Sequence, residues 1–204
     1  MAEQVFPTKG NLIKIKKSLE LARTGFDLLD RKRNILVRET MALIDTAKEI
    51  QSLINTTYAK AYEALQAANV TLGLVDEIAA GIPVENGVSI SYRSVMGVEI
   101  PSVTLDANPR KNYFGYQRTS MQLDEAYARF DDVKRLTARL AEIENSVYRL
   151  AQGIRKTQKR ANALKNIIIP RFDGQVKFIS DALEEKEREE FSRLKVIKKT
   201  LDKQ

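Results

Sequence analysis

An unbroken heptad pattern near the N-terminus constrains this chain more than any other feature. From Leu12 to Ile54, apolar residues recur at alternating steps of three and four, and only Arg33 and Thr40 interrupt their apolar character. A repeat that averages about 3.5 residues is typical of a left-handed coiled coil. Because the stripe is long and narrow, we expect this helix to lie along a second helix of similar length.

A second seam of the same kind occupies the C-terminal half. The three-four alternation is unbroken from Val133 to Ile168, Pro170 then intervenes, and the apolar pattern resumes out of phase at Phe172. A proline inside a helix removes a backbone hydrogen bond, so we predict a kink or a local change of supercoil near Pro170. The predicted coiled-coil seam comprises Leu12, Ile15, Leu19, Phe26, Leu29, Leu36, Leu43, Ile50, Leu140, Ile143, Val147, Leu150, Ile154, Leu164 and Ile168.

The segment between the two seams, residues 73–118, has a different pattern. A short helical stretch ends at Gly81, and alternating apolar residues then predict a β-hairpin over about 88–105 with its turn near Ser94–Gly97. Residues 106–118 are predicted to form an ordered loop. An isolated hairpin is marginal in water, so this one should lean on the helices or on a partner. The predicted hairpin residues are Val88, Ile90, Tyr92, Met96, Gly97, Val98, Ile100 and Pro101.

Together these patterns predict an all-α dominated fold, a long antiparallel two-helix coiled coil with a small central β-hairpin segment. Six acids in Asp181–Glu190 would lie near the bases of Lys14–Arg33, which favours this antiparallel register. The seams alone also allow parallel pairing within a homodimer. The predicted segments are a tail at 1–7, a helix at 8–72, the central segment at 73–118, a helix at 119–200 and a tail at 201–204.

The composition excludes most catalytic chemistry. The chain has no His and no Cys, so it lacks the usual general base, thiolate nucleophiles and nearly all zinc-ligand sets. No glycine-rich phosphate-binding motif occurs. We interpret the acids of Asp181–Glu190 as a solvated helix face rather than a metal site. The expected catalytic, cofactor-binding and metal-ligating residues are therefore none.

The charge predicts an acidic partner. The net charge is +7, and bases are concentrated in Lys9–Arg38 and Ala151–Arg171. Aromatic and amide side chains for nucleic-acid readout are sparse there, so we expect no nucleic-acid partner. Arg33, within the seam, has two interpretations: its head reaches solvent or an acid on the second helix, or it determines the register. The opening residues MAEQVFPTKG lack a signal-peptide core and no window approaches about 20 apolar residues, so we expect a cytoplasmic protein without membrane insertion.

Four segments carry a resemblance to a known family: PTKGNLIKIKKSLELARTGFDLLDRKRNILVRE, VMGVEIP, FGYQRTSMQLDEAYARF, and RANALKNIIIP with EEKEREEFSRLKVIKK. In this order they resemble the D subunit, the central-stalk rotor component of V-type and archaeal-type (V/A) ATPases. The conjunction of PTKGNL, VMGVEIP and NALKNIIIP is the specific part of the resemblance.

The resemblance implies a rotor shaft without catalytic residues. In that family, A and B subunits form the ring that hydrolyses or makes ATP, the F subunit binds the coiled coil, and a socket subunit called d or C couples the shaft to the ion-carrying membrane ring. The implied location is cytoplasmic and peripheral to the membrane; H⁺ versus Na⁺ coupling is left open. The residues that we expect to contact the ring are Lys9, Lys14, Lys16, Lys17, Arg23, Arg31, Arg33, Arg160, Lys165 and Arg171.

Two other classes share parts of the pattern. A prefoldin-like holdase, or another cytoplasmic coiled-coil scaffold, also joins paired helices by β-hairpins, but a holdase needs an apolar tip for its clients. A nucleic-acid or membrane tether would explain the charge and would show salt-sensitive binding to DNA or anionic vesicles without any ring subunit.

Overall fold

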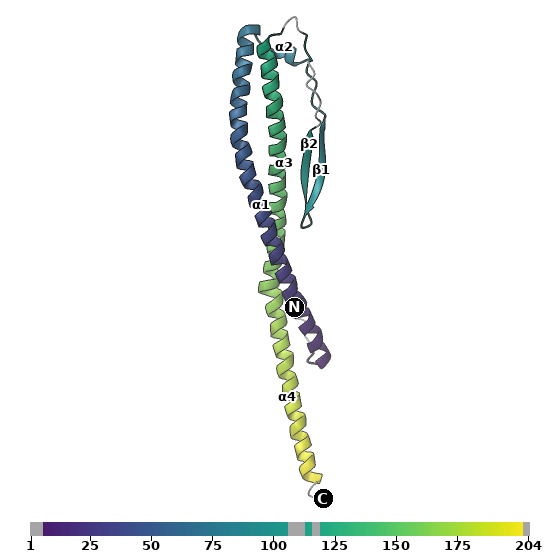
Figure 1. The fold of residues 1–204 in the computed structure, drawn as a ribbon. Coiled ribbons are helices and arrows are strands. Elements are labelled where there is room, and N and C mark those ends of the chain that lie inside the picture. Colours follow the sequence, from purple (N-terminus) through teal and green to yellow (C-terminus); the bar gives the residue numbers. More distant parts are fainter. Residues whose placement is uncertain (1–5, 106–112, 116–118, 202–204) are drawn as a thin grey trace. The chain divides into compact units, whose positions relative to one another are not determined.

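The computed structural model describes residues 6–105, 113–115 and 119–201. Most of the predicted tails and of the predicted loop at 106–118 therefore lies outside the described residues. The elements follow in the order α1 (Lys9–Leu72), α2 (Asp76–Ala79), β1 (Val88–Val95), β2 (Val98–Leu105), α3 (Met121–Ala163), a π-helical segment (Leu164–Ile168) and α4 (Ile169–Leu201). Figure 1 labels the α-helices and strands. The chain divides into a terminal unit, Met1–Asn34 with Arg155–Gln204, and a middle unit, Ile35–Ile154.

The terminal unit is an antiparallel pair of helices. The Thr8 hydroxyl accepts a hydrogen bond from the Asn11 N–H at 3.2 Å and so caps the start of α1. Along the pair, Lys9 contacts Glu187 at 2.9 Å and Arg23 contacts Asp173 at 2.9 Å, so residue numbers rise on one helix as they fall on the other. The antiparallel register that the charge pattern predicted is therefore present in this unit.

The π-helical segment Leu164–Ile168 lies where the second seam changes phase. The step from Ile168 to Phe172 is four residues where the alternation requires three, so the seam carries one extra residue. A π turn takes one residue more than an α turn, and it restores the seam so that Ile179 is fully buried. The carbonyl that the missing Pro170 N–H would have bound belongs to Asn166, inside the same segment. The predicted kink near Pro170 stays a prediction.

In the middle unit, α1 and α3 pack antiparallel around successive apolar clusters. Ile50 and Ile54 of α1 are buried together with Ile143 of α3. Nearer the end of α1, the Tyr62 and Phe130 rings meet edge to face, with centroids 5.6 Å apart. The cluster joins Ile50 and Ile54 of the first predicted seam to Ile143 of the second.

The β-hairpin has a continuous antiparallel register from Val88 opposite Leu105 to Val95 opposite Val98. Its two turn residues, Met96 and Gly97, have φ values of 50° and 73°. Two positive φ angles in a two-residue loop are typical of the type I′ turn, whose twist matches that of paired strands. The predicted hairpin is confirmed.

The hairpin leans on the helices through β2, as its marginal stability required. Ile100 of β2 is buried with Leu36 of α1 and Leu150 of α3. Beside this cluster, Gly153 of α3 leaves room for Val98, since a Cβ at Gly153 would lie 2.7 Å from Val98 Cγ2. The absence of a side chain at Gly153 therefore permits the close approach of strand and helix.

The predicted fold class is confirmed: the chain is mainly helical, with long N- and C-terminal helices and a small hairpin between them. Each predicted seam position is buried or half-buried. Burial of these side chains stabilises each helical pair by about 25 cal/mol per Å² of apolar surface removed from water.

We predict that Gly153→Ala lowers the free energy of unfolding or leaves it unchanged. Gly174→Ala should raise the free energy of unfolding. An exposed helix position gains about 0.5–1 kcal/mol when alanine replaces glycine, and a Cβ at Gly174 meets nothing within 4 Å. At Gly153 the new methyl group would collide with the stiff Val98 side chain. Urea unfolding of both variants measures the difference.

The double variant Gly153→Ala with Val98→Ala provides the control for this steric interpretation. Removing the Val98 methyl groups should make the Gly153→Ala change less harmful than it is alone. Equal gains at both glycines in the otherwise unchanged chain would contradict the close approach of Val98.

Candidate interaction surface

The cations that were predicted to contact the ring fall into two groups in the terminal unit. Lys9 and Arg23 are engaged across the helical pair with Glu187 and Asp173. The Lys165 ammonium lies over the Phe26 ring, 5.8 Å from its centroid. These side chains hold the two helices of the unit together. Arg171 also has an interaction within the chain.

Arg33 combines parts of its two predicted roles. Its Nη1 donates to Gln158 Oε1 on the facing helix at 2.9 Å, and its Nη2 contacts Asp30 Oδ1 at 2.7 Å. The acid is thus on its own helix, and the partner across the seam is an amide. A directional hydrogen bond of this kind favours one register of the pair.

The second group of cations is exposed and makes no side-chain hydrogen bond or ion pair within the described part of the chain. These residues are Lys14, Lys16, Lys17, Arg31 and Arg160. Exposed and unneutralised bases are available to a partner at no cost to internal contacts. The sequence did not separate the two groups, because pairing depends on which residues the register brings face to face.

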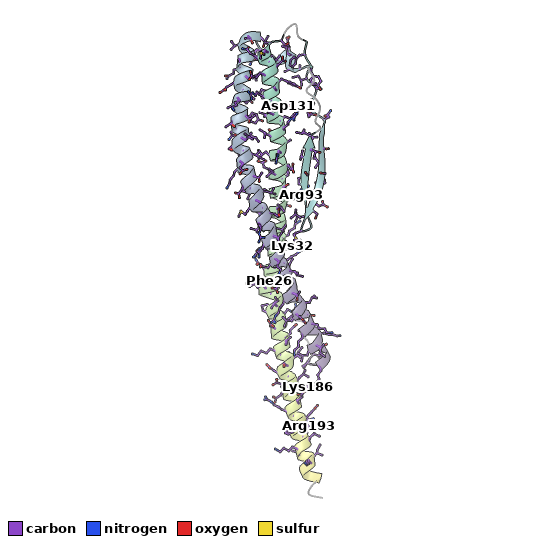
Figure 2. The ribbon with its side chains drawn as sticks, in the orientation of Figure 1. Phe26, Lys32, Arg93, Asp131, Lys186 and Arg193 are labelled. Carbon is purple, nitrogen blue, oxygen red and sulfur yellow. The ribbon has the colours of Figure 1, made fainter. Side chains whose placement is uncertain are left out.

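The acidic stretch of α4 contacts α1 less than the charge pattern predicted. Glu187 reaches Lys9, whereas Glu184 and Glu189 lie 3.9 and 3.8 Å from Arg188 and Arg193 on their own helix. Figure 2 shows Lys186 and Arg193 on this part of α4. Exposed pairs one turn apart contribute only about 0.3–0.5 kcal/mol.

The last turns of α4 carry exposed apolar side chains. Phe191 and Leu194 are 68% and 64% exposed, and Val196 and Ile197 are exposed as well. They lie beyond Glu187, which faces Lys9 at the start of α1. This end of α4 therefore presents apolar surface that the terminal unit itself does not bury.

In the middle unit, Lys134 joins the segment before β1 to α3. Its Nζ lies 2.7 Å from Glu85 Oε2 and 2.9 Å from Asp131 Oδ1. The hydrogen bond from Lys134, and then that from the Gly87 N–H, lowers the pKa of Glu85. The same bond to Glu85, followed by that to Asp131, raises the pKa of Lys134. Both shifts favour the charged pair.

Sequence reasoning missed both Lys134 and Arg149. The Arg149 guanidinium lies over the Tyr92 ring, 5.2 Å from its centroid, and donates to the Glu99 carbonyl at 3.3 Å. Both residues attach the hairpin segment to α3. Contacts between residues far apart in the sequence leave no periodic signal. The sequence showed only that Lys134 and Arg149 lie outside the apolar seam.

Within the described ranges, no cluster of acidic side chains is arranged to hold a metal ion. The same ranges contain no helix with the length and apolar character needed to cross a membrane. The two units thus present exposed charge, exposed apolar side chains at the end of α4, and the hairpin.

Paired long helices with an attached hairpin define the class of protein: an antiparallel coiled-coil protein with a strongly charged surface. The chain belongs to the family of ATP synthase D subunits, whose sequence profile matches residues 11–199. Membership implies a multi-subunit ATPase complex, and it weighs against the holdase and tether alternatives.

Curated relatives cover nearly the whole chain. The V-type ATP synthase D subunit of Thermotoga neapolitana is 46% identical over 196 residues, which is 95% of this chain and 97% of the relative. The A-type ATP synthase D subunits of Pyrococcus furiosus and Thermococcus sibiricus are 38% and 37% identical over 204 residues, 98% of this chain and 95% of each relative. The predicted resemblance to the D subunits of V/A ATPases is confirmed.

We predict that Lys134→Met lowers the Tm at neutral pH and that the difference from the wild type shrinks in acid. The pKa of Glu85 is lowered in the folded state, so its stabilising contribution is complete above the unfolded pKa and is lost as pH falls through the folded pKa. Circular dichroism melts from neutral pH to about pH 3 measure the effect.

Lys48→Met is the matched control, because Lys48 makes an exposed pair with Asp45 at 3.9 Å on its own helix. Its Tm difference from the wild type should be small, because an exposed pair on one helix contributes little. A Lys134→Met difference that persists unchanged in acid would contradict the role given to the Glu85 carboxylate.

Proposed function

We propose that this chain is the central rotor shaft of a V/A-type rotary ATPase or ATP synthase. It transmits torque between the ring of A and B subunits, where ATP is hydrolysed or made, and the ion-translocating membrane ring. It carries no catalytic residue of its own. The observation that supports this proposal most is α1, one unbroken helix from Lys9 to Leu72 that is packed against a second long helix in both units.

Torque transmission requires stiffness, and packed seams supply it. Twisting one helix against the other would pull buried side chains such as Leu36, Leu150 and Ile179 out of close packing. Cross-helix pairs such as Arg23 with Asp173 resist sliding along the seam. A helical pair also lacks threefold symmetry, so each of three ring sites would meet a different face of it at any moment.

The part that enters the ring is residues 8–50 and 160–200 in this proposal. The unneutralised bases Lys14, Lys16, Lys17, Arg31 and Arg160 would meet acidic or carbonyl groups of the A and B subunits. Because charge attraction is long-ranged, it tolerates changes of register during rotation. The exposed apolar end of α4 around Phe191 and Leu194 would be covered there as well.

The hairpin-bearing part would face the F subunit and the socket subunit (d or C). In this arrangement the protein is cytoplasmic and is held at the membrane through the complex. The Lys134 and Arg149 contacts would keep the hairpin fixed on α3 while partners bind it.

We predict that the triple variant Leu29→Ala, Leu164→Ala and Ile168→Ala uncouples ATP hydrolysis from ion movement. These half-buried side chains lie in the seam of the terminal unit, and large-to-alanine changes in well-packed cores cost about 2–5 kcal/mol each. Reconstituted complexes should hydrolyse ATP but move fewer ions per ATP.

The matched control is Leu21→Ala, Leu28→Ala and Ile167→Ala, three exposed residues of the same types in the same unit. This variant should retain the thermal stability of the wild-type shaft. Unchanged coupling in the seam variant, in a complex that assembles normally, would remove the stiffness argument.

We also predict that Lys14→Glu with Lys17→Glu slows assembly of the shaft with the A–B ring by about tenfold at low salt. The loss should shrink at high salt, where charges are screened. Lys60→Glu with Arg139→Glu, two exposed bases of the middle unit that lie outside the ring-entering ranges, is the control. Association rates from stopped-flow fluorescence report the effect, and equal rates for the two variants would exclude a ring-facing role for Lys14 and Lys17.

A further inference from the structure

The two long edges of the hairpin differ in their hydrogen bonds with the rest of the chain. The edge of β2 faces α3, where the Ser146 hydroxyl donates to the Pro101 carbonyl at 3.4 Å and Arg149 donates to the Glu99 carbonyl at 3.3 Å. Pro101 has no N–H to offer at that edge. The edge of β2 that faces α3 is thereby occupied. Figure 1 shows β1 on the side of β2 that is away from α3.

The register determines which backbone groups of β1 point outward. In a two-residue hairpin, the residues flanking the turn, Val95 and Val98, exchange both hydrogen bonds, and bonded and non-bonded pairs then alternate. Tyr92 opposite Pro101 is therefore a non-bonded pair, as the proline requires. The residues of β1 whose N–H and C=O groups point outward are Val88, Ile90, Tyr92 and Ser94.

The outer edge of β1 has few of the features that protect natural edge strands. It contains no proline, no lysine and no bulge over eight residues, and Arg93 is its one charged residue. Val88, Ile90 and Tyr92 are 48%, 56% and 59% exposed. Among the described residues, no strand pairs with this edge. An unpaired edge that is regular and partly apolar is a template for another strand.

We propose that β1 is a strand-addition site, at which an extended segment of another subunit of the same complex pairs with the outer edge of β1. This inference rests on the proposed function for the identity of the complex and goes beyond it in naming the contact. Main-chain hydrogen bonds from the outward groups give affinity, and alternate side chains give specificity.

The side chains of β1 indicate the chemistry of that segment. On the face of Val88 and Ile90 the added strand carries apolar residues, because aliphatic side chains on neighbouring strands pack there. On the opposite face it carries a carboxylate next to Arg93, which is exposed and which Figure 2 labels on the hairpin. A second copy of this chain fits less well. Pairing of β1 with another β1 would bring a second Arg93 to the same edge, and β1 contains no acid to neutralise it.

Hydrogen–deuterium exchange at single-residue resolution tests the pairing, with the isolated full chain compared with the intact complex. In the isolated chain the inward amides of Ser91 and Arg93 should be protected by β2, and the outward amides of Ile90 and Tyr92 should exchange fast. In the complex the outward amides should slow by at least about tenfold, which gives an alternating pattern that simple burial does not produce.

Ile90→Pro and Ile90→Thr form a matched pair of variants. Both lose the isoleucine side chain, but only proline removes an outward N–H, and neither touches the β1–β2 bonds. In the complex, Ile90→Pro should lose the protection of the Tyr92 amide by about tenfold relative to Ile90→Thr. Protected Ser91 and Arg93 amides in both isolated variants show that the hairpin is intact.

Three results would overturn the strand-addition site. The first is exchange of the outward amides in the complex that is as fast as in the isolated chain. The second is equal protection in the two Ile90 variants. The third is protection that already appears in the isolated chain and grows with its concentration, which would mean self-pairing. Co-purification of A and B subunits is scored before exchange, so failure of the proposed function is recognised separately.

Discussion

The packing of one helical seam against another is the interaction on which the rest of this structure depends. A long single helix has no core of its own, and its stability comes from burying a stripe against a partner. Here α1 supplies the stripe in both units, and α3 and α4 supply its counterpart. The hairpin is secondary to this arrangement, because Ile100 is buried only where Leu36 and Leu150 already meet.

The seam could be predicted because heptad spacing is a direct consequence of helix geometry. The extra residue between Ile168 and Phe172 was visible too, as a break in phase. What the sequence alone did not determine was how the extra residue is taken up. A kink and a π turn relieve the same mismatch, and the choice depends on whether Ile179 and its neighbours can return to the seam.

Individual side-chain contacts across large sequence separations were beyond prediction. The register of the helical pair decides that Arg23 meets Asp173 and that Arg33 meets Gln158, so it also decides which bases are left exposed. Lys134 and Arg149 stood in the sequence as ordinary exposed helix residues. Their roles arise only when the hairpin folds back on α3, an event that depends on the small size of Gly153.

The features that folding itself does not explain are the most informative about function. Folding accounts for Arg23, Lys165 and the closed edge of β2, since each is used inside its own unit. It does not account for the exposed bases around Lys14 and Lys17, or for an unprotected strand edge. In an isolated chain such bases repel one another, and such an edge invites wrong contacts. These features persist when partners cover them, which is the situation of a protein that works inside a multi-subunit ATPase.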